Sequence, residues 1–165
     1  MTGLPSTVGG KPAEKTPSQR TVNLKSKKIP IEIIEQYVAL RNRYRDLINS
    51  REVSVEETIE WLSESHTILY GIVEGDALLG AVVIYVDKDH ELTFFSRTSG
   101  KGIGTVLLKL ADELAKEHKI ERLWAWTFCD NVPARKSFIK NGWILKEEDK
   151  ENDRLYFEKT TVSES

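Results

Sequence analysis

The run SGKGIGT at residues 99–105 decides the fold, because it joins a predicted strand to a clearly amphipathic helix. The strand is expected at residues 91–96. The helix after the run carries one apolar stripe, formed by Val106, Leu107, Leu110, Ala111, Leu114 and Ala115. A helix start leaves backbone N–H groups unpaired at the positive end of the helix dipole. Glycines let an anion approach these groups closely, so the run is typical of a phosphate-binding loop.

The glycine spacing separates this loop from two common nucleotide-binding loops. A Walker loop requires glycine five residues before its Gly-Lys pair and Ser or Thr after it, and here those places hold Phe95 and Gly102. The dinucleotide-binding pattern is Gly-x-Gly-x-x-Gly, whereas Gly100, Gly102 and Gly104 alternate strictly. A turn that merely ends the strand is the remaining alternative. Three alternating glycines are poor helix formers, which favours a ligand-binding loop.

Outward from the loop, hydrophobic periodicity predicts the other helices and strands. Upstream, we expect a strand at 21–24, a helix from Pro30 through Leu47, and a second helix after Ser54, which forms a capping box with Glu57. Two strands at 67–73 and 78–86 follow, joined by a Glu-Gly-Asp hairpin turn. Downstream, we expect a strand at 122–128, a short helix at 133–140, and a strand pair at 143–145 and 155–158. This order predicts a mixed α/β fold with a mostly antiparallel central sheet flanked by helices.

The composition indicates one globular domain. The chain has 165 residues, 39% hydrophobic and 30% charged, with a net charge of −2. These values argue against a membrane protein and against a nucleic-acid binder with a global basic field. The single cysteine, Cys129, cannot form an internal disulfide and no secretory leader is visible, so we expect a cytoplasmic monomer or homodimer. We expect a disordered basic tail at 1–20, the folded domain at 21–159 and a flexible end at 160–165.

A second motif follows the predicted strand at 122–128. It consists of Asn131-Val132-Pro133-Ala134, then Phe138, then Gly142-Trp143. Together with Gly102-Ile103-Gly104, it resembles the GNAT superfamily of CoA-dependent N-acetyltransferases. Two departures stand out: Ser99 replaces the leading Gln or Arg of the glycine motif, and Phe138 replaces a tyrosine that commonly acts as the acid for the departing thiolate. A phenyl ring cannot donate a proton, so Tyr156 or water is the expected substitute.

The resemblance implies that acetyl-CoA binds with its pyrophosphate on the glycine loop. The residues expected to contact the cofactor are Phe94, Phe95, Ser99, Gly100, Lys101, Gly102, Ile103, Gly104, Thr105, Asn131 and Phe138. In the family, a backbone N–H of the strand before the loop polarises the thioester oxygen, and Phe94-Phe95 is the corresponding stretch. Glu91 is the first candidate for the general base and His90 the second. Simple solvation at a strand edge remains an alternative for both, as does helix capping for Asn131.

The resemblance also implies that the N-terminal half builds the pocket for a small amine acceptor. Arg41, Asn42 and Arg51 are similar to a stretch of bacterial enzymes that acetylate nucleotide-linked amino sugars, where arginines could clamp a diphosphate. Ordinary surface arginines, a peptide N-terminus as acceptor, and a CoA-binding module without catalysis remain alternatives. His66, His90 and His118 show no metal-ligand spacing, so we expect no metal.

Overall fold

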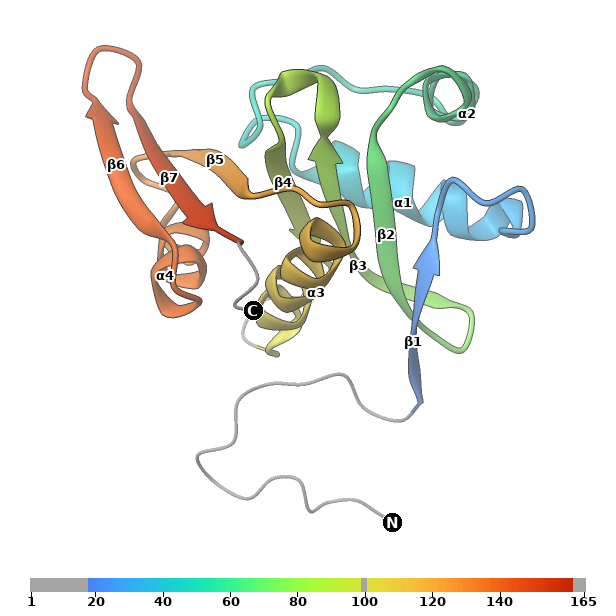
Figure 1. Cartoon of the computed structure of the whole chain (residues 1–165). Helices are drawn as coiled ribbons and strands as arrows, with labels where there is room; N and C mark the ends of the chain where they lie inside the picture. The colour runs from blue at the N-terminus through green and yellow to red at the C-terminus, as the bar shows by residue number, and fades with distance from the viewer. Residues whose placement is uncertain (1–17, 99–100, 162–165) are drawn as a thin grey trace.

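A seven-stranded sheet of order β1-β2-β3-β4-β5-β7-β6 runs through the computed structural model, which describes residues 18–98 and 101–161 (Figure 1). All neighbouring strands are antiparallel except β4 and β5, which are parallel. The strands are β1 (Gln19–Asn23), β2 (Ile68–Glu74), β3 (Ala77–Tyr85), β4 (Glu91–Ser96), β5 (Arg122–Phe128), β6 (Ile144–Asp149) and β7 (Arg154–Thr160). This confirms the predicted mixed α/β class.

Helices cover both faces of the sheet (Figure 1). They are α1 (Ile31–Arg43), α2 (Val55–Glu64), α3 (Ile103–Glu117) and α4 (Val132–Lys140). The side chains of β3 alternate between the two layers: Val82 and Ile84 pack with α3, whereas Ala81 and Val83 pack with α1. The central strands are therefore apolar on both faces and hold the glycine loop at the end of β4.

Local sequence signals start the helices and turns as predicted. Gly75 adopts a φ of 60° in the turn between β2 and β3, a conformation that glycine reaches without strain. Ser54 and Glu57 form the predicted capping box of α2. Asn131 caps α4 by accepting a hydrogen bond from the Ala134 N–H at 3.4 Å.

Helix α1 is shorter than the sequence predicts, because it ends at Arg43 instead of continuing to Leu47. Tyr44 turns out of the helix, and its hydroxyl donates to the Ser96 carbonyl at 2.6 Å. The Asn42 side chain hydrogen-bonds both backbone groups of Val53, at 2.9 and 3.0 Å. These tertiary bonds outweigh the helical periodicity of the sequence.

Both domain boundaries also move outward. Gln19 and Arg20, assigned to the tail from the sequence, form part of β1 and pair with β2. Strand β7 continues through Thr160, and the buried Thr161 N–H donates to the Glu121 carbonyl at 2.8 Å. Backbone hydrogen bonds between strands need no apolar side chain, so hydrophobicity did not reveal these residues. Residues 1–17 and 162–165 of the predicted tail and end lie outside the described part.

Among the helices of residues 18–98 and 101–161, none has the length and apolarity needed to cross a membrane.

Candidate active site

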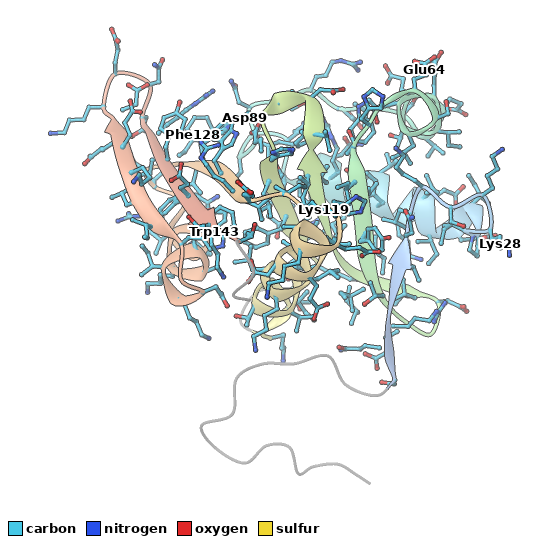
Figure 2. All side chains as sticks on the ribbon, in the orientation of Figure 1. Lys28, Glu64, Asp89, Lys119, Phe128 and Trp143 are labelled. Atoms are coloured by element: carbon cyan, nitrogen blue, oxygen red, sulfur yellow. The ribbon has the colours of Figure 1, made fainter. Side chains whose placement is uncertain are left out.

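The parallel neighbours β4 and β5 separate soon after they meet. Glu91 and Trp124 form their one Cα pair, and the Trp124 N–H donates to the His90 carbonyl at 3.4 Å. Beyond that pair, β4 continues along β3 while β5 pairs over its full length with β7. Figure 1 shows β5 leaving β4 in this way, and Figure 2 labels Phe128 at the far end of β5. The sheet therefore opens between two neighbouring strands that would otherwise be hydrogen-bonded along their length.

The ladder pattern of β4 directs the Phe94 N–H into this opening. The Arg97 N–H donates to the Leu79 carbonyl at 2.8 Å, so the odd-numbered residues of β4 exchange hydrogen bonds with β3. The even-numbered residues then point their backbone groups toward β5, which no longer pairs at the level of Phe94. Of the two phenylalanines proposed from the sequence, Phe94 is thus the one with a backbone donor at the opening.

The start of α3 supplies further backbone donors. Gly102 is the N-cap residue with a φ of 81°, and no side chain among the described residues caps the helix. The first N–H to bond within the helix is that of Val106, which donates to the Gly102 carbonyl at 3.1 Å. The preceding N–H groups, at Ile103, Gly104 and Thr105, therefore have no intrahelical partner and lie at the positive end of the dipole. Ser99 and Gly100 lie outside the described residues, and Lys101 is exposed.

One cavity of about 890 Å³ joins the strand opening to the start of α3 and to the α1–α2 side. It contains most of the residues predicted from the sequence. The predicted residues on its wall are Arg41, Arg51, Glu91, Phe94, Gly102, Ile103, Gly104, Thr105, Asn131 and Phe138. Residues that the sequence did not single out as ligands also line it, including Tyr44, Trp61, Tyr85, Trp126 and Thr127.

Glu91 is the acidic residue of β4 on this wall. Its carboxyl is half-buried, and this burial raises its pKa above the ordinary value, partly offset by the Lys88 ammonium, the Trp126 indole and the Arg154 guanidinium. Tyr85, its partner across the β3–β4 ladder, has its pKa raised to about 12 by burial and by the Glu91 charge. The carboxyl is therefore tuned toward accepting a proton.

Three sequence-based assignments do not reach this cavity. His90 adopts a φ of 68° and lines a separate cavity of about 390 Å³ instead. Phe95 is 1% exposed and packs against Tyr37 and Tyr44 on the α1 face of the sheet. The physical reason is that the Tyr37 and Tyr44 rings cover Phe95, whereas Glu91 and Thr93, on the same face of β4, reach the cavity.

Asn42 is the third, because its amide is used within the fold. Its Oδ1 accepts from the Val53 N–H at 3.0 Å and its Nδ2 donates to the Val53 carbonyl at 2.9 Å. Asn42 therefore closes the loop between α1 and α2 and does not line the cavity. The loop's own wall residues depend on this closure for their position.

Asn42→Ala is expected to lower the free energy of unfolding by about 1–3 kcal/mol, because two partly buried backbone groups of Val53 lose their partner. Urea denaturation of the wild type and the variant measures this difference. Glu35→Ala, an exposed change on the same helix, should stay within about 0.5 kcal/mol of the wild type. An unchanged urea midpoint for Asn42→Ala would show that the loop between α1 and α2 keeps its structure without the Asn42 side chain.

Arg41 and Arg51 line the cavity but are also bonded to the loop. Arg41 donates to the Ser50 hydroxyl at 2.6 Å and to the Arg51 carbonyl. Arg51 forms an ion pair with Glu57 at 2.8 Å, and this arginine, with Ser54, lowers the pKa of Glu57 to about 2. The Arg51 charge is thus balanced by a neighbouring carboxylate, whereas Arg41 hydrogen-bonds neutral groups of Asn42, Ser50 and Arg51.

Phe138 and Asn131 occupy the α4 wall. The Phe138 ring is 2% exposed and packs between Phe94, Trp143 and Phe157, with ring centroids 5.5, 4.8 and 5.2 Å away. Figure 2 shows Trp143 beside α4. Tyr156, the suggested substitute acid, stacks on Trp124 at 6.2 Å and does not line the cavity. In the described residues, no group of three or more His, Cys, Asp or Glu side chains is placed to hold a metal ion.

Comparisons with known proteins show the same fold. The YxbD protein of Bacillus subtilis (strain 168) is 30% identical over 90 residues, and the chain spans about half the length of this curated relative, 52%. The structure of yncA from Salmonella typhimurium with acetyl-CoA superposes with a TM-score of 0.71 at 10% identity, covering 90% of this chain and 96% of that one. The N-acetyltransferase PseH of Campylobacter jejuni gives a TM-score of 0.66 at 20% identity, covering 88% and 100%.

The model of the acetyltransferase (GNAT) family matches residues 34–143, which is most of the chain and includes both sequence motifs. The chain belongs to the acetyltransferase (GNAT) family.

Proposed function

We propose that the protein transfers an acetyl group from acetyl-CoA to a primary amine within the cavity between β4 and β5. One observation carries this proposal. Phe94, the first residues of α3 and Glu91 all line a single cavity. The reaction requires a hydrogen-bond donor for the thioester oxygen of acetyl-CoA and further donors for the diphosphate of CoA. It also requires a base that removes a proton from the amine.

The part of the cavity lined by the first residues of α3, called the groove below, would hold the CoA pyrophosphate. A Cβ atom added to Gly104 would lie 3.3 Å from the Phe94 ring and 3.4 Å from the Ser137 hydroxyl, so the missing side chain keeps the groove open. The N–H groups of Ile103, Gly104 and Thr105 lie at this groove. Backbone donors at the positive end of a helix favour a phosphate group, and they do so without the Gln or Arg that Ser99 replaces.

Bound acetyl-CoA would supply an acyl carbon activated by its thioester. The Phe94 N–H would donate to the oxygen of that acyl group as negative charge develops on it, an interaction typically worth about 3 kcal/mol. The groove would hold the diphosphate and thereby fix the acyl group next to the opening in β4 and β5. The residues of the chain therefore bind and orient the donor before the amine attacks.

Glu91 would remove the proton from the attacking amine, directly or through one water. An alkyl amine with a pKa near ~10.4 is uncharged in only about one molecule in 2,500 at pH 7. Burial raises the pKa of Glu91 and so makes it a better proton acceptor than an ordinary carboxylate. The proton acceptor and the acyl oxygen donor come from the same strand, three residues apart.

The wall contributed by α1, α2 and their loop is suited to a small polar acceptor. Trp61, Tyr85 and Trp126 offer flat faces, and Arg41 offers a cationic group, whereas the charge of Arg51 is balanced by Glu57. A nucleotide-linked amino sugar has a primary amine, a planar base and an anionic diphosphate that match this wall. A peptide N-terminus is the competing acceptor, because it presents an amine of the same chemistry.

Incubation with acetyl-CoA and a panel of amino sugars, amino acids and peptides tests the proposal. Free thiol released by the protein, with a mass increase of one acetyl group on one class of amine, is the expected result. CoA binding without thiol release for every amine would favour a binding module. Absence of any CoA binding would contradict the proposal entirely.

A further inference from the structure

Thr127, on β5, has a hydroxyl that the fold leaves without a partner. The residue is 3% exposed and lines the main cavity. Its Oγ1 is buried and has no hydrogen-bond partner among residues 18–98 and 101–161. An unsatisfied buried hydroxyl costs about 1–3 kcal/mol, so such a group commonly has a functional reason.

The strand register places Thr127 across the opening from Phe94. Glu91 and Trp124 are partners in the parallel pair, and each of the two residues lies three positions further along its own strand. Strands rise by nearly the same distance per residue, so the two lie at the same level where the strands diverge. Thr127 also shares the α3–α4 face of β5 with Leu123 and Ala125. Phe94 presents its ring to Phe138 on this same face.

Two other hydroxyl groups on the cavity wall are less suited to meet the reacting thioester. The Tyr44 hydroxyl already donates to the Ser96 carbonyl, at 2.6 Å. Ser137 lies beside Gly104, at the end of the groove where the phosphates are expected. Phe138 has no donor, and Tyr156 does not line the cavity. Thr127 combines an unused donor with a position opposite the Phe94 N–H.

We propose that Thr127 donates a hydrogen bond to the sulfur of CoA and stabilises the thiolate as the acetyl group leaves. The proposal rests on the function proposed above. The amine nitrogen forms a bond to the acyl carbon, the carbon–sulfur bond breaks with its electron pair on sulfur, and the amine proton passes to Glu91. Water then takes the proton from Glu91 and delivers a proton to the thiolate, so the carboxylate is restored and CoA leaves as the thiol. The Thr127 hydroxyl keeps its own proton and takes the place that a tyrosine acid would have at Phe138.

Thr127→Val replaces the hydroxyl by a methyl group of similar size, and Thr127→Ser keeps the hydroxyl. The first measurement is the pKa of the CoA thiol in the complex. It is obtained from the ultraviolet absorbance of the thiolate during a pH titration. We expect Thr127→Val to raise this pKa by about one unit relative to the wild type, and Thr127→Ser to restore most of the shift. With a reactive amine, kcat should fall about tenfold with little change in the KM for acetyl-CoA.

Calorimetry with CoA and with desulfo-CoA, which lacks the sulfur, separates this role from a structural one. At a pH where the thiol is ionised, Thr127→Val should weaken CoA binding and leave desulfo-CoA binding unchanged. Its melting temperature should equal or exceed that of the wild type, because an unpaired buried hydroxyl has been removed. If the wild type, Thr127→Val and Thr127→Ser all bind CoA with the same thiol pKa, the role of Thr127 is overturned and the proposed function is not. Failure of the wild type to bind CoA would overturn the proposed function and this inference with it.

Discussion

Gly104→Val is expected to weaken CoA binding by at least about 100-fold. A Cβ atom at this position already meets the Phe94 ring at 3.3 Å and the Ser137 hydroxyl at 3.4 Å. The two further methyl groups of valine would extend into the groove beside the N–H groups of Ile103, Gly104 and Thr105. Isothermal titration calorimetry with CoA measures the loss directly.

Gly104→Ala is the graded control for this substitution. Its single methyl group requires shifts of only a few tenths of an ångström, so we expect a smaller loss of affinity than with valine. Neither variant should unfold the helix, because glycine is a poorer helix former than alanine or valine. Wild-type affinity in a folded Gly104→Val protein would show that the diphosphate does not bind at the start of α3.

Glu91→Gln is expected to lower kcat/KM for the amine by about 10²–10⁴. Glutamine keeps the size and polarity of the side chain but cannot accept the proton of the amine. In the wild type, the rate should rise with pH as Glu91 ionises, and this rise should occur above the usual range of a carboxyl because burial raises its pKa. The variant should lose that limb of the profile. Steady-state rates across the pH range provide the measurement.

Stability and a neighbouring histidine serve as controls for Glu91. Because the folded-state pKa is raised, ionisation of Glu91 disfavours the folded state as pH rises through it, so Glu91→Gln should be at least as stable as the wild type at pH 7. His90→Asn changes the preceding residue, which lines the other cavity. His90 has a positive φ, and asparagine adopts such a conformation readily. The His90→Asn variant should keep the wild-type profile. A Glu91→Gln enzyme with an unaltered profile would exclude Glu91 as the base.

The sequence predicted the elements of the fold well where local chemistry determines them. The Ser54–Glu57 capping box, the Asn131 cap and the glycine turn of the β2–β3 hairpin are contained in a few adjacent residues. The end of α1 was missed because it depends on bonds from Tyr44 to Ser96 and from Asn42 to Val53, both distant in sequence. Such tertiary bonds leave no periodic signal.

The residues predicted for the site lie in more than one place in the structure. The motif residues of α3 and α4 lie on the cavity wall, whereas Phe95 is covered by the Tyr37 and Tyr44 rings and His90 lines the second cavity. The roles proposed for Thr127 and the Phe94 N–H depend on the divergence of β4 and β5. No local pattern in either strand encodes this divergence. From the sequence alone, Thr127 is an ordinary threonine of an alternating strand, because the separation of β4 from β5 is not visible there.

The central claim is that CoA binds in the opening between β4 and β5 with its diphosphate at the start of α3. Backbone amide chemical shifts, recorded by NMR while CoA is added to the wild-type protein, test it directly. We predict the largest shifts at Phe94, Gly102, Ile103, Gly104 and Thr105. Unperturbed amides at these five positions, with shifts concentrated around Tyr70 and Ile120 of the second cavity, would contradict the claim.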